Sequence, residues 1–325
     1  MSNSFMIDAY GRSGSERDEI KAKVERLNQI AKENWDNPKW RYEAAAAITN
    51  TIYRGFEHEN LLNLMTTVEN APFDGRVFIK EVRGLKAFWV ARGAYIEQST
   101  LRADVIELPR DIIGFHVGEM EDKIRTNFAE TQAALVDLGI QRMDAEINLR
   151  FLRLLQAAVP SGADQYISQA GFSLTSLNTA LREVRDETRD FSGVVIIGRA
   201  TMTDHILETL TANQTNTGFI PETNEDVLKR GVLGTYRGAK IITLKNYKDD
   251  SETPFFPANE MFVIAKDASR CAFWGGMQAK EWVENDSWYW HYMAKREFGG
   301  IVHRPRRLRR IVDTSIPAYT STPGE

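Results

Sequence analysis

Cysteine is almost absent from this sequence, because Cys271 is the only one among 325 residues. An intrachain disulfide and a zinc site built from several cysteines are therefore both excluded. Long apolar runs are also missing, since no stretch of about 18 apolar residues occurs. The opening MSNSFMIDAYGRSGSERDEI has neither the basic start nor the apolar block of a secretory signal. We therefore expect a soluble chain that is not secreted through a signal peptide.

The sequence also lacks the motifs of common enzyme classes. GVLGTYRGAK, residues 231–240, has the wrong glycine spacing for a Walker A phosphate loop, and GVVIIGRATM, residues 193–202, lacks the glycine-rich dinucleotide loop. The five histidines show no paired metal spacing, and no G-x-S-x-G nucleophile elbow occurs. Cys271 lies among apolar residues, as a small buried hydrophobe would. The sequence predicts no catalytic, metal-binding or cofactor-binding residue, and an α/β enzyme with an unrecognised site is kept as an alternative.

The net charge is −4, which argues against a protein that coats nucleic acid over its whole surface. One segment departs from this balance: HRPRRLRR, residues 303–310, contains Arg304, Arg306, Arg307, Arg309 and Arg310. The apolar pairs before and after it indicate an ordered strand rather than a mobile basic signal. Alternation along a strand would place Arg307 and Arg309 on the face opposite the other three arginines, so that neither face is an ordinary buried core face.

The first half of the chain shows helical and then mixed periodicity. Apolar spacing predicts two amphipathic helices over residues 15–35 and 41–65. Strands are predicted at Arg76–Val82 and Asp104–Val117, with about 20 residues between them, as in a long two-stranded excursion. The stretch 119–159 has apolar residues mostly four, seven or eight apart, which predicts one helix of about 40 residues that ends at Pro160.

The second half alternates helix and strand, which is typical of an α/β domain. Helices are predicted at 173–188 and 202–210, and strands at 193–198, 239–244 and 261–265. Aromatic residues then gather between 273 and 292: Phe273, Trp274, Trp282, Trp288, Tyr289, Trp290 and Tyr292. Stacking on nucleic-acid bases is an alternative for such a cluster, but burial in a core or a subunit interface is favoured.

Four stretches in this order carry a resemblance: GLKAFWVARGAYIEQSTLRADVIELPRDIIGFHVGEMED, GVVIIGRATMTDHIL, VLGTYRGAKIITLKN and EFGGIVHRPRRLRRIVD. Together they resemble the major capsid proteins of tailed double-stranded DNA bacteriophages, which have the Hong Kong 97-type fold. The resemblance covers roughly residues 60–313. It implies an α+β fold with an N-terminal arm, an extended β-hairpin loop, a long spine helix, a peripheral domain and an axial domain.

The resemblance also implies a division of the chain. The N-terminal arm and its helices would occupy 1–72, and the extended loop 83–103. The peripheral domain would comprise 73–82, 104–164 and 291–316, with the spine helix at 119–159. The axial domain would comprise 165–290.

The function that the resemblance implies is self-assembly of hexamers and pentamers into an icosahedral shell around the phage DNA, with no catalytic step. The extended loop would lie across a neighbouring subunit through Arg83, Lys86, Phe88, Trp89, Arg92 and Tyr95. The basic strand, Arg304 to Arg310, would lie near subunit contacts. One of its faces would bind acidic residues of the same or a neighbouring chain, such as Asp104, Glu107, Asp111, Glu119 or Glu121. The other face would contact packaged DNA without sequence preference.

The implied partners are other copies of the chain, a portal, a decoration protein and, because only residues 1–72 precede the first strand, a separate scaffold protein. The protein would be part of the virion after assembly in the cytoplasm of the bacterial host, without a membrane partner. Two further alternatives remain open at this point. An encapsulin, the shell protein of a cellular nanocompartment, shares the fold, and a sequence-specific DNA-binding protein would use the arginines to bind bases.

Overall fold

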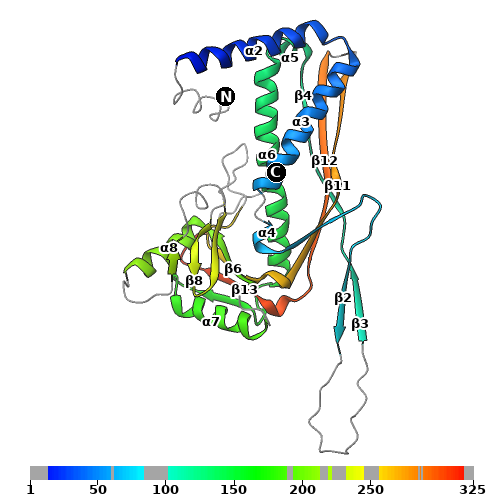
Figure 1. Cartoon of the computed structure of the whole chain (residues 1–325). Coiled ribbons are helices and arrows are strands. Elements are labelled where there is room, and N and C mark those ends of the chain that lie inside the picture. The colour runs from blue at the N-terminus through cyan, green and yellow to red at the C-terminus, as the bar shows by residue number, and fades with distance from the viewer. Residues whose placement is uncertain are drawn as a thin grey trace, which may run out of the picture.

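The structure, a computed structural model, describes residues 14–59, 62–83, 102–188, 193–212, 219–221, 232–244, 256–284, 286 and 288–317. Figure 1 shows an elongated body in which one long helix, α6 (Phe128–Ala158), runs beside a tall sheet, with an α/β domain at its lower end. A two-stranded hairpin projects beyond this body. Among the described residues, no helix is long and apolar enough to cross a membrane.

The tall sheet has four strands in the order β1-β11-β12-β4. Its members are β1 (Thr67–Ala71), β4 (Asp111–Met120), β11 (Ser269–Glu284) and β12 (Tyr289–Val302). Alternation along β12 buries Trp290, Tyr292 and Ala294 against α6 and against α3 (Pro38–Glu59), while the residues between them are half-buried. The sheet therefore has one face covered by helices, as is common for strands paired like β11, β12 and β4, which are antiparallel, whereas β1 pairs parallel to β11.

The aromatic stretch lies mainly in this sheet, and most of its predicted burial is confirmed. Phe273, Trp274, Trp290 and Tyr292 are buried, whereas Trp288 is 71% exposed. Trp290 belongs to an aromatic cluster with Trp35, Trp40 and Phe128 near the upper end of α6, where α2 (Gly14–Asn34) also packs. The aromatic residues thus join the N-terminal helices to the sheet.

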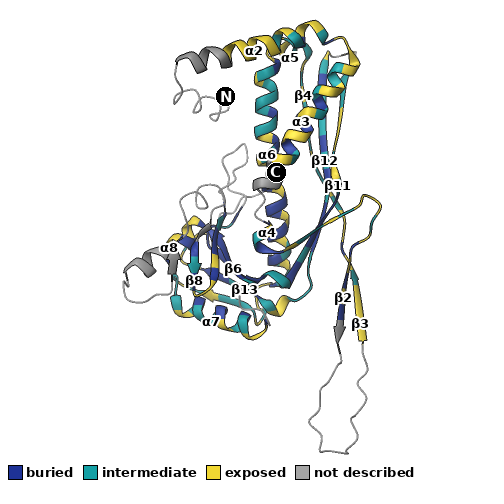
Figure 2. Cartoon of the chain, in the orientation of Figure 1, coloured by how far each residue is buried: buried dark blue, intermediate teal, exposed yellow. Residues whose placement is uncertain are grey.

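The α/β domain contains a seven-stranded sheet in the order β5-β13-β10-β6-β9-β8-β7. Its strands are β5 (Tyr166–Gln169), β6 (Val194–Arg199), β7 (Phe219–Pro221), β8 (Val232–Tyr236), β9 (Ala239–Leu244), β10 (Glu260–Ala265) and β13 (Leu308–Asp313). Two helices belong to this domain, α7 (Leu174–Asp186) and α8 (Ala200–Ala212). Every residue of β6 and β10 is buried, because α7 packs on one face of the sheet and the lower half of α6 on the other (Figure 2).

The predicted single helix over 119–159 is wrong at its start. The chain is still in strand β4 at Met120, forms a short helix α5 (Glu121–Thr126), breaks at Asn127 and only then enters α6. The side chain of Asn28 in α2 accepts a hydrogen bond from the backbone N–H of Ala129 at 2.9 Å. A tertiary cap therefore satisfies a donor in the first turn of α6, and local periodicity does not reveal such a cap.

Two segments lie in a different sheet from the one that the division of the chain implies. Residues 269–284, expected in the axial domain, form β11 of the four-stranded sheet, and residues 308–313, expected in the peripheral domain, form β13 between β5 and β10. The chain crosses between the sheets at two short 3₁₀ turns, η2 (Lys266–Ala268) and η3 (Pro305–Arg307). Apolar strands on both sides of such a turn look alike in sequence, so the pattern does not tell which sheet each one joins.

The projecting hairpin consists of β2 (Phe78–Arg83) and β3 (Arg102–Glu107), paired from Phe78↔Glu107 to Arg83↔Arg102. The predicted strand over 104–117 is therefore two strands, separated at residues 108–110, where Pro109 supplies no backbone donor. Ile79 and Leu108 pack at the base of the hairpin against Ala272 and Trp274 of β11. Gly299 of β12 lies so close to the carbonyl of Pro109 that a larger residue would collide with it.

Candidate functional site

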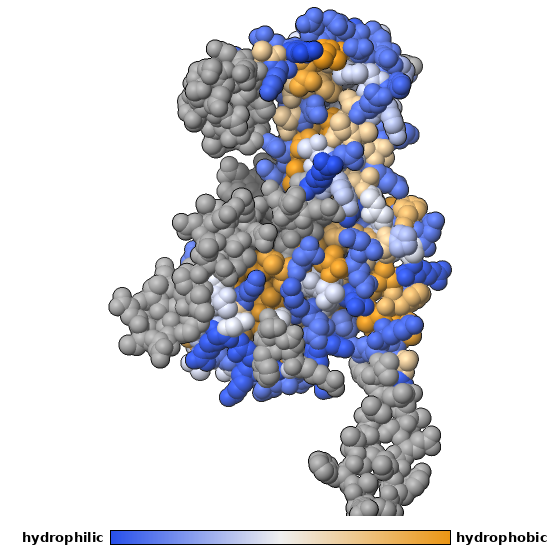
Figure 3. All heavy atoms as spheres, in the orientation of Figure 1, coloured by the Kyte–Doolittle hydropathy of each residue, from blue (hydrophilic) through white to orange (hydrophobic). Residues whose placement is uncertain are grey.

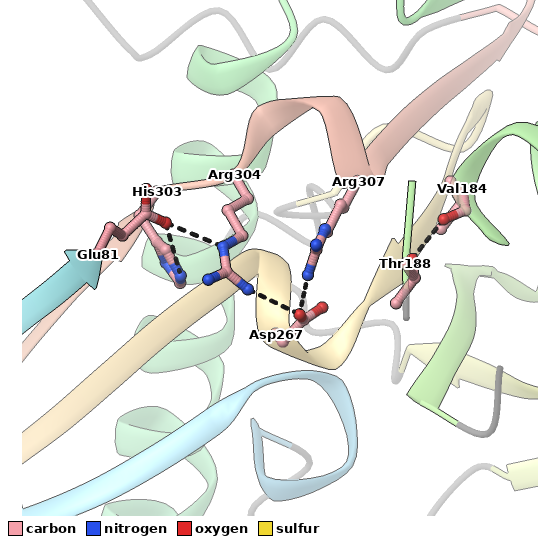
Figure 4. A network of polar contacts seen from close by, with 7 residues as sticks. All are labelled: Glu81, Val184, Thr188, Asp267, His303, Arg304 and Arg307. Carbon is pink, nitrogen blue, oxygen red and sulfur yellow. Dashed lines mark hydrogen bonds and ion pairs between the residues drawn. The ribbon is translucent and has the colours of Figure 1, made fainter. Parts of the chain in front are cut away.

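The predicted basic segment lies where three parts of the chain meet (Figure 4). Glu81 comes from the base of the hairpin, Asp267 from η2, and His303, Arg304 and Arg307 from the chain around η3. The turns themselves are held together, because the backbone N–H groups of His303 and Arg304 both donate to the carbonyl of Ala268 at 3.1 Å. The side chains are therefore brought together by the crossing points between the two sheets.

Arg304 is the centre of this network. Its Nε donates to Glu81 Oε1 at 2.9 Å, and its second guanidinium nitrogen donates to Asp267 Oδ2 at 2.9 Å. Arg307 donates to the same oxygen of Asp267. The side chain of Glu81 is only 6% exposed, so its charge depends on this partner. The network thus ties the base of the hairpin to both crossing turns.

His303 is the titratable member of the network. Its Nε2 lies 3.8 Å from Glu81 Oε1, and its side chain is 8% exposed. Burial lowers the pKa of His303 below its ordinary value of 6.5, the positive charge of Arg304 lowers it further, and Glu81 acts in the opposite direction. His303 is therefore uncharged near neutral pH, and Arg304 carries the positive charge opposite Glu81.

The last two arginines of the segment point to opposite faces of the seven-stranded sheet, as predicted for strand neighbours. Arg309 Nε donates to Glu183 Oε2 of α7 at 2.7 Å. Arg310 donates to Glu260 Oε1 of β10 at 2.6 Å and to the carbonyl of Val159 at 3.2 Å. Both side chains are largely buried, so these ion pairs are part of the domain core.

The prediction of one continuous strand over 303–310 is wrong. Pro305 begins a 3₁₀ turn, and the strand starts only at Leu308. Residues three apart in a 3₁₀ turn share a side, which is why Arg304 and Arg307 reach the same carboxylate instead of opposite faces. The expectation that neither face is a core face is also wrong, because Leu308, Ile311 and Val312 are buried.

The acidic partners within the chain also differ from those expected. They are Glu81, Glu183, Glu260 and Asp267. Four of the expected carboxylates bind elsewhere in the chain, with Glu107 near Arg76, Asp111 on Arg150, Glu119 on Lys123 and Glu121 on Trp35. Among the described residues Arg306 alone of the five arginines has no ion-pair partner, and it is exposed.

The expected contact residues of the extended loop cannot be placed. Lys86, Phe88, Trp89, Arg92 and Tyr95 lie outside the described residues, as does the side chain of Arg83 in β2. The described part of the hairpin has two unlike faces. Ile79 and Glu81 are buried against the body, whereas Phe78 and Val105, on the opposite face, are 42% and 56% exposed.

Cys271 and the pair His116 and His291 are other reactive groups in the described part of the chain. Burial raises the pKa of Cys271 to about 12, so its thiol stays protonated at neutral pH. His116 Nε2 and His291 Nδ1 lie 3.1 Å apart, and both rings stack near Trp282. No group of three or more His, Cys, Asp or Glu side chains in the described residues is placed to hold a metal ion.

A protein-family model matches residues 43–299, which is more than half of the chain. The family is described as "SPbeta prophage-derived putative capsid protein YonB". No curated protein sequence matches the chain significantly.

Several solved structures with a similar fold come from phages. A structure from Microbacterium phage Oxtober96 has a TM-score of 0.57 at 13% identity, with 78% of this chain and 91% of that chain covered. The capsid structure of the cyanophage P-SCSP1u has a TM-score of 0.54 at 10% identity, covering 79% and 87%. The mature capsid of bacteriophage PhiM1 has a TM-score of 0.53 at 9% identity, covering 79% and 88%. At such identities the likeness lies in the fold, and it extends over nearly the whole of each phage chain.

Proposed function

Because the chain belongs to the YonB family of prophage capsid proteins and has the Hong Kong 97-type fold, we propose that it forms hexamers and pentamers that close an icosahedral shell around double-stranded DNA. As a structural protein of a phage capsid, the chain works by contacts between copies. The question is which of its surfaces are built for such contacts.

The observation that carries the proposal is the two-faced hairpin. Glu81 and Ile79 attach one face to the body, and the network of Arg304 and Asp267 fixes the base. The hairpin then extends beyond the body (Figure 1). Phe78 and Val105 are exposed on its other face. On an isolated subunit such apolar exposure on a projecting element is an aggregation liability, whereas a neighbouring copy would bury it. We propose that this face contacts the adjacent subunit.

The edge of the four-stranded sheet supports the same proposal. β4 is an edge strand, and its outward positions include Ile112 at 64% exposure and Met120 at 55%. A long edge strand with exposed apolar side chains favours association with another chain. We propose that this edge lies at a second subunit contact.

The basic segment has a smaller role in this proposal than its sequence indicates. Four of its arginines are neutralised inside the chain, so Arg306 is the member that we propose for contact with a second subunit or with DNA. A portal, a separate scaffold protein and a decoration protein remain proposed partners. The proposed location is the virion, after assembly in the host cytoplasm.

Electron microscopy of the purified full chain, expressed alone and together with its neighbouring genes, tests the proposal. The wild type is expected to form icosahedral shells, and the double variant Phe78→Ser with Val105→Ser is expected to remain as small soluble species. Leu27→Ser, which removes a 46% exposed apolar side chain from α2, is the matched control and should still form shells. A small oligomer of fixed size from the wild-type chain under both conditions would overturn the proposal.

A further inference from the structure

An open hollow lies on the α/β domain, between α7 and the turn that joins β8 to β9. Its volume is about 460 Å³. Seven of its eight lining residues are polar or charged: Thr175, Asn178, Thr179, Arg182, Arg185, Asp186 and Arg237, with Leu181 as the apolar member. Three guanidinium groups against one carboxylate make it a cationic site in a chain whose net charge is −4.

The walls of this hollow are joined by specific hydrogen bonds. The hydroxyl of Tyr236 donates to Asn178 Oδ1 at 2.9 Å, which fixes the end of β8 to α7. Arg185 of α7 donates to the backbone carbonyl of Arg237 in the turn. Arg185 Nε is buried and has no hydrogen-bond partner among the described residues. The two walls are therefore set in place, and Arg185 retains an unused donor.

The backbone of the turn gives a second reason to regard the hollow as a built site. Arg237 has φ +48° and Gly238 has φ +82°, so both central residues of this two-residue hairpin turn are left-handed. Such a turn favours asparagine or aspartate followed by glycine, and an arginine in the first position is strained. The Arg237 guanidinium lies over the ring of Tyr236, 5.6 Å from its centroid. Arg237 thus has a strained backbone and a guanidinium that is held over Tyr236. Such strain is commonly found at functional sites, which indicates that this side chain has a function.

The cations of the hollow are not neutralised in the way that the basic segment is. Neither Arg182, Arg185 nor Arg237 forms an ion pair with a residue that the structure describes, and Arg182 and Arg237 are exposed. Lys240, on β9 beside the turn, is also exposed, and the 3₁₀ turn that carries Arg306 packs against α7. The lower border of the α/β domain, where Figure 1 places α7, is mainly hydrophilic in Figure 3.

We propose that the hollow binds backbone phosphates of the packaged DNA duplex, through Arg182, Arg185 and Arg237. This inference rests on the proposed function, because it requires that the shell encloses DNA. Guanidinium groups bind phosphate oxygens in bidentate geometry, and contacts to the backbone carry no sequence information. If the hollow were instead a contact with a neighbouring subunit, a single carboxylate of that subunit would pair with only one of these three arginines. Three separate cations around an open hollow suit the successive charges of a continuous polyanion.

Binding of a fluorescently labelled, mixed-sequence DNA duplex to the unassembled full chain, measured by anisotropy over a series of NaCl concentrations, tests the inference. The variant Arg182→Gln with Arg237→Asn should bind several-fold more weakly. Its plot of log affinity against log salt should be shallower by about 2, since about one unit is lost for each phosphate contact removed. The control, Arg26→Gln with Arg54→Gln, removes the same charge from exposed positions on α2 and α3 and should behave like the wild type.

Thermal unfolding separates a binding role from a folding role. Asparagine adopts left-handed backbone more readily than arginine, so the variant should unfold at the same temperature as the wild type or higher while it binds DNA more weakly. Unchanged affinity and salt dependence would overturn the inference. So would loss of shell assembly with unchanged DNA affinity, because the arginines would then serve a subunit contact. If the wild type forms no shells but binds DNA through these arginines, the phosphate site stands and the proposed shell function fails.

Discussion

The arginines around η3 and the arginines of the α7 hollow lie on the same α/β domain but differ in what surrounds them. Arg304, Arg307, Arg309 and Arg310 each reach a carboxylate of the same chain, whereas Arg182 and Arg237 are exposed and have no carboxylate partner among the residues that the structure describes. The arginines around η3 are close together in the sequence, but their charges are neutralised in the folded chain. The arginines of the α7 hollow come from two distant parts of the sequence, but together they form a cationic surface. Local charge in the folded chain therefore depends on pairing more than on the number of arginines in a segment.

The largest effect on this comparison is expected from Arg310, because this arginine and its partner Glu260 are both largely buried, at 15% and 9% exposure. Arg310→Ala would leave Glu260, which is 9% exposed, with a hydrogen bond from Gln156 as its remaining polar contact among the described side chains. Breaking such a pair costs about 3 kcal/mol, because one charge stays buried without its partner. Urea unfolding monitored by circular dichroism measures the change. Arg306→Ala, an exposed arginine of the same segment, is the matched control and should change stability by less than about 0.5 kcal/mol.

Substitution of Glu81 is expected to have an intermediate effect on stability and also to reduce shell assembly. Glu81→Gln keeps the size of the side chain but removes the charge that Arg304 binds, and we expect a loss of about 2 kcal/mol because Arg304 is partly open to solvent. The base of the hairpin would loosen, so the yield of shells in electron micrographs should fall.

The control for Glu81 comes from the same hairpin. Glu107→Gln removes a 51% exposed carboxylate that lies 3.7 Å from Arg76, and surface pairs of this kind contribute less than about 1 kcal/mol. Equal stability losses for the two variants would show that burial of Glu81 does not matter to the network.

The smallest expected effect on stability comes from His303, and it is measured as a change in the pH dependence of the free energy of unfolding. The folded state holds the pKa of His303 below 6.5, so the unfolded chain binds the proton more readily. The contribution of this histidine to stability is therefore complete above about pH 6.5 and is lost as the pH falls below that value. The free energy of unfolding of His303→Asn should decline less between about pH 7 and about pH 5 than that of the wild type. Parallel pH profiles for the two proteins would contradict this account.

The sequence predicted those parts of the fold that depend on local patterns. The strand 239–244 and the helix 173–188 carry clear periodicity, and both appear as β9 and α7 within two residues of the expected bounds. The break at Asn127 was missed because the side chain that caps α6 after it, Asn28, lies 101 positions from the amide that it caps. The exchange of β11 and β13 between sheets was missed because it depends on two short turns and not on the strands themselves.

The candidate sites were predictable only in part. Arginine density marked the segment 304–310, but its partners Glu81 and Asp267 carry no sequence signal, because they are 223 and 37 positions away from Arg304. The α7 hollow left one usable signal, the Arg237-Gly238 pair between two strands, which a search for hairpin turns identifies as an unusual substitution at a left-handed position. The contact residues expected in the extended loop remain predictions, since they lie outside the described residues.

The passage of α6 beside both sheets has a consequence for the cooperativity of the molecule. Phe151, Leu152 and Leu155 share one apolar cluster with Ile197 and Ile264 of the seven-stranded sheet and with Phe273 and Phe298 of the four-stranded sheet. The two sheets therefore share one core along this helix, so loss of either sheet removes part of the packing of the other. The protein should melt in one transition, with the helix acting as a common folding nucleus rather than as a linker between independently stable units.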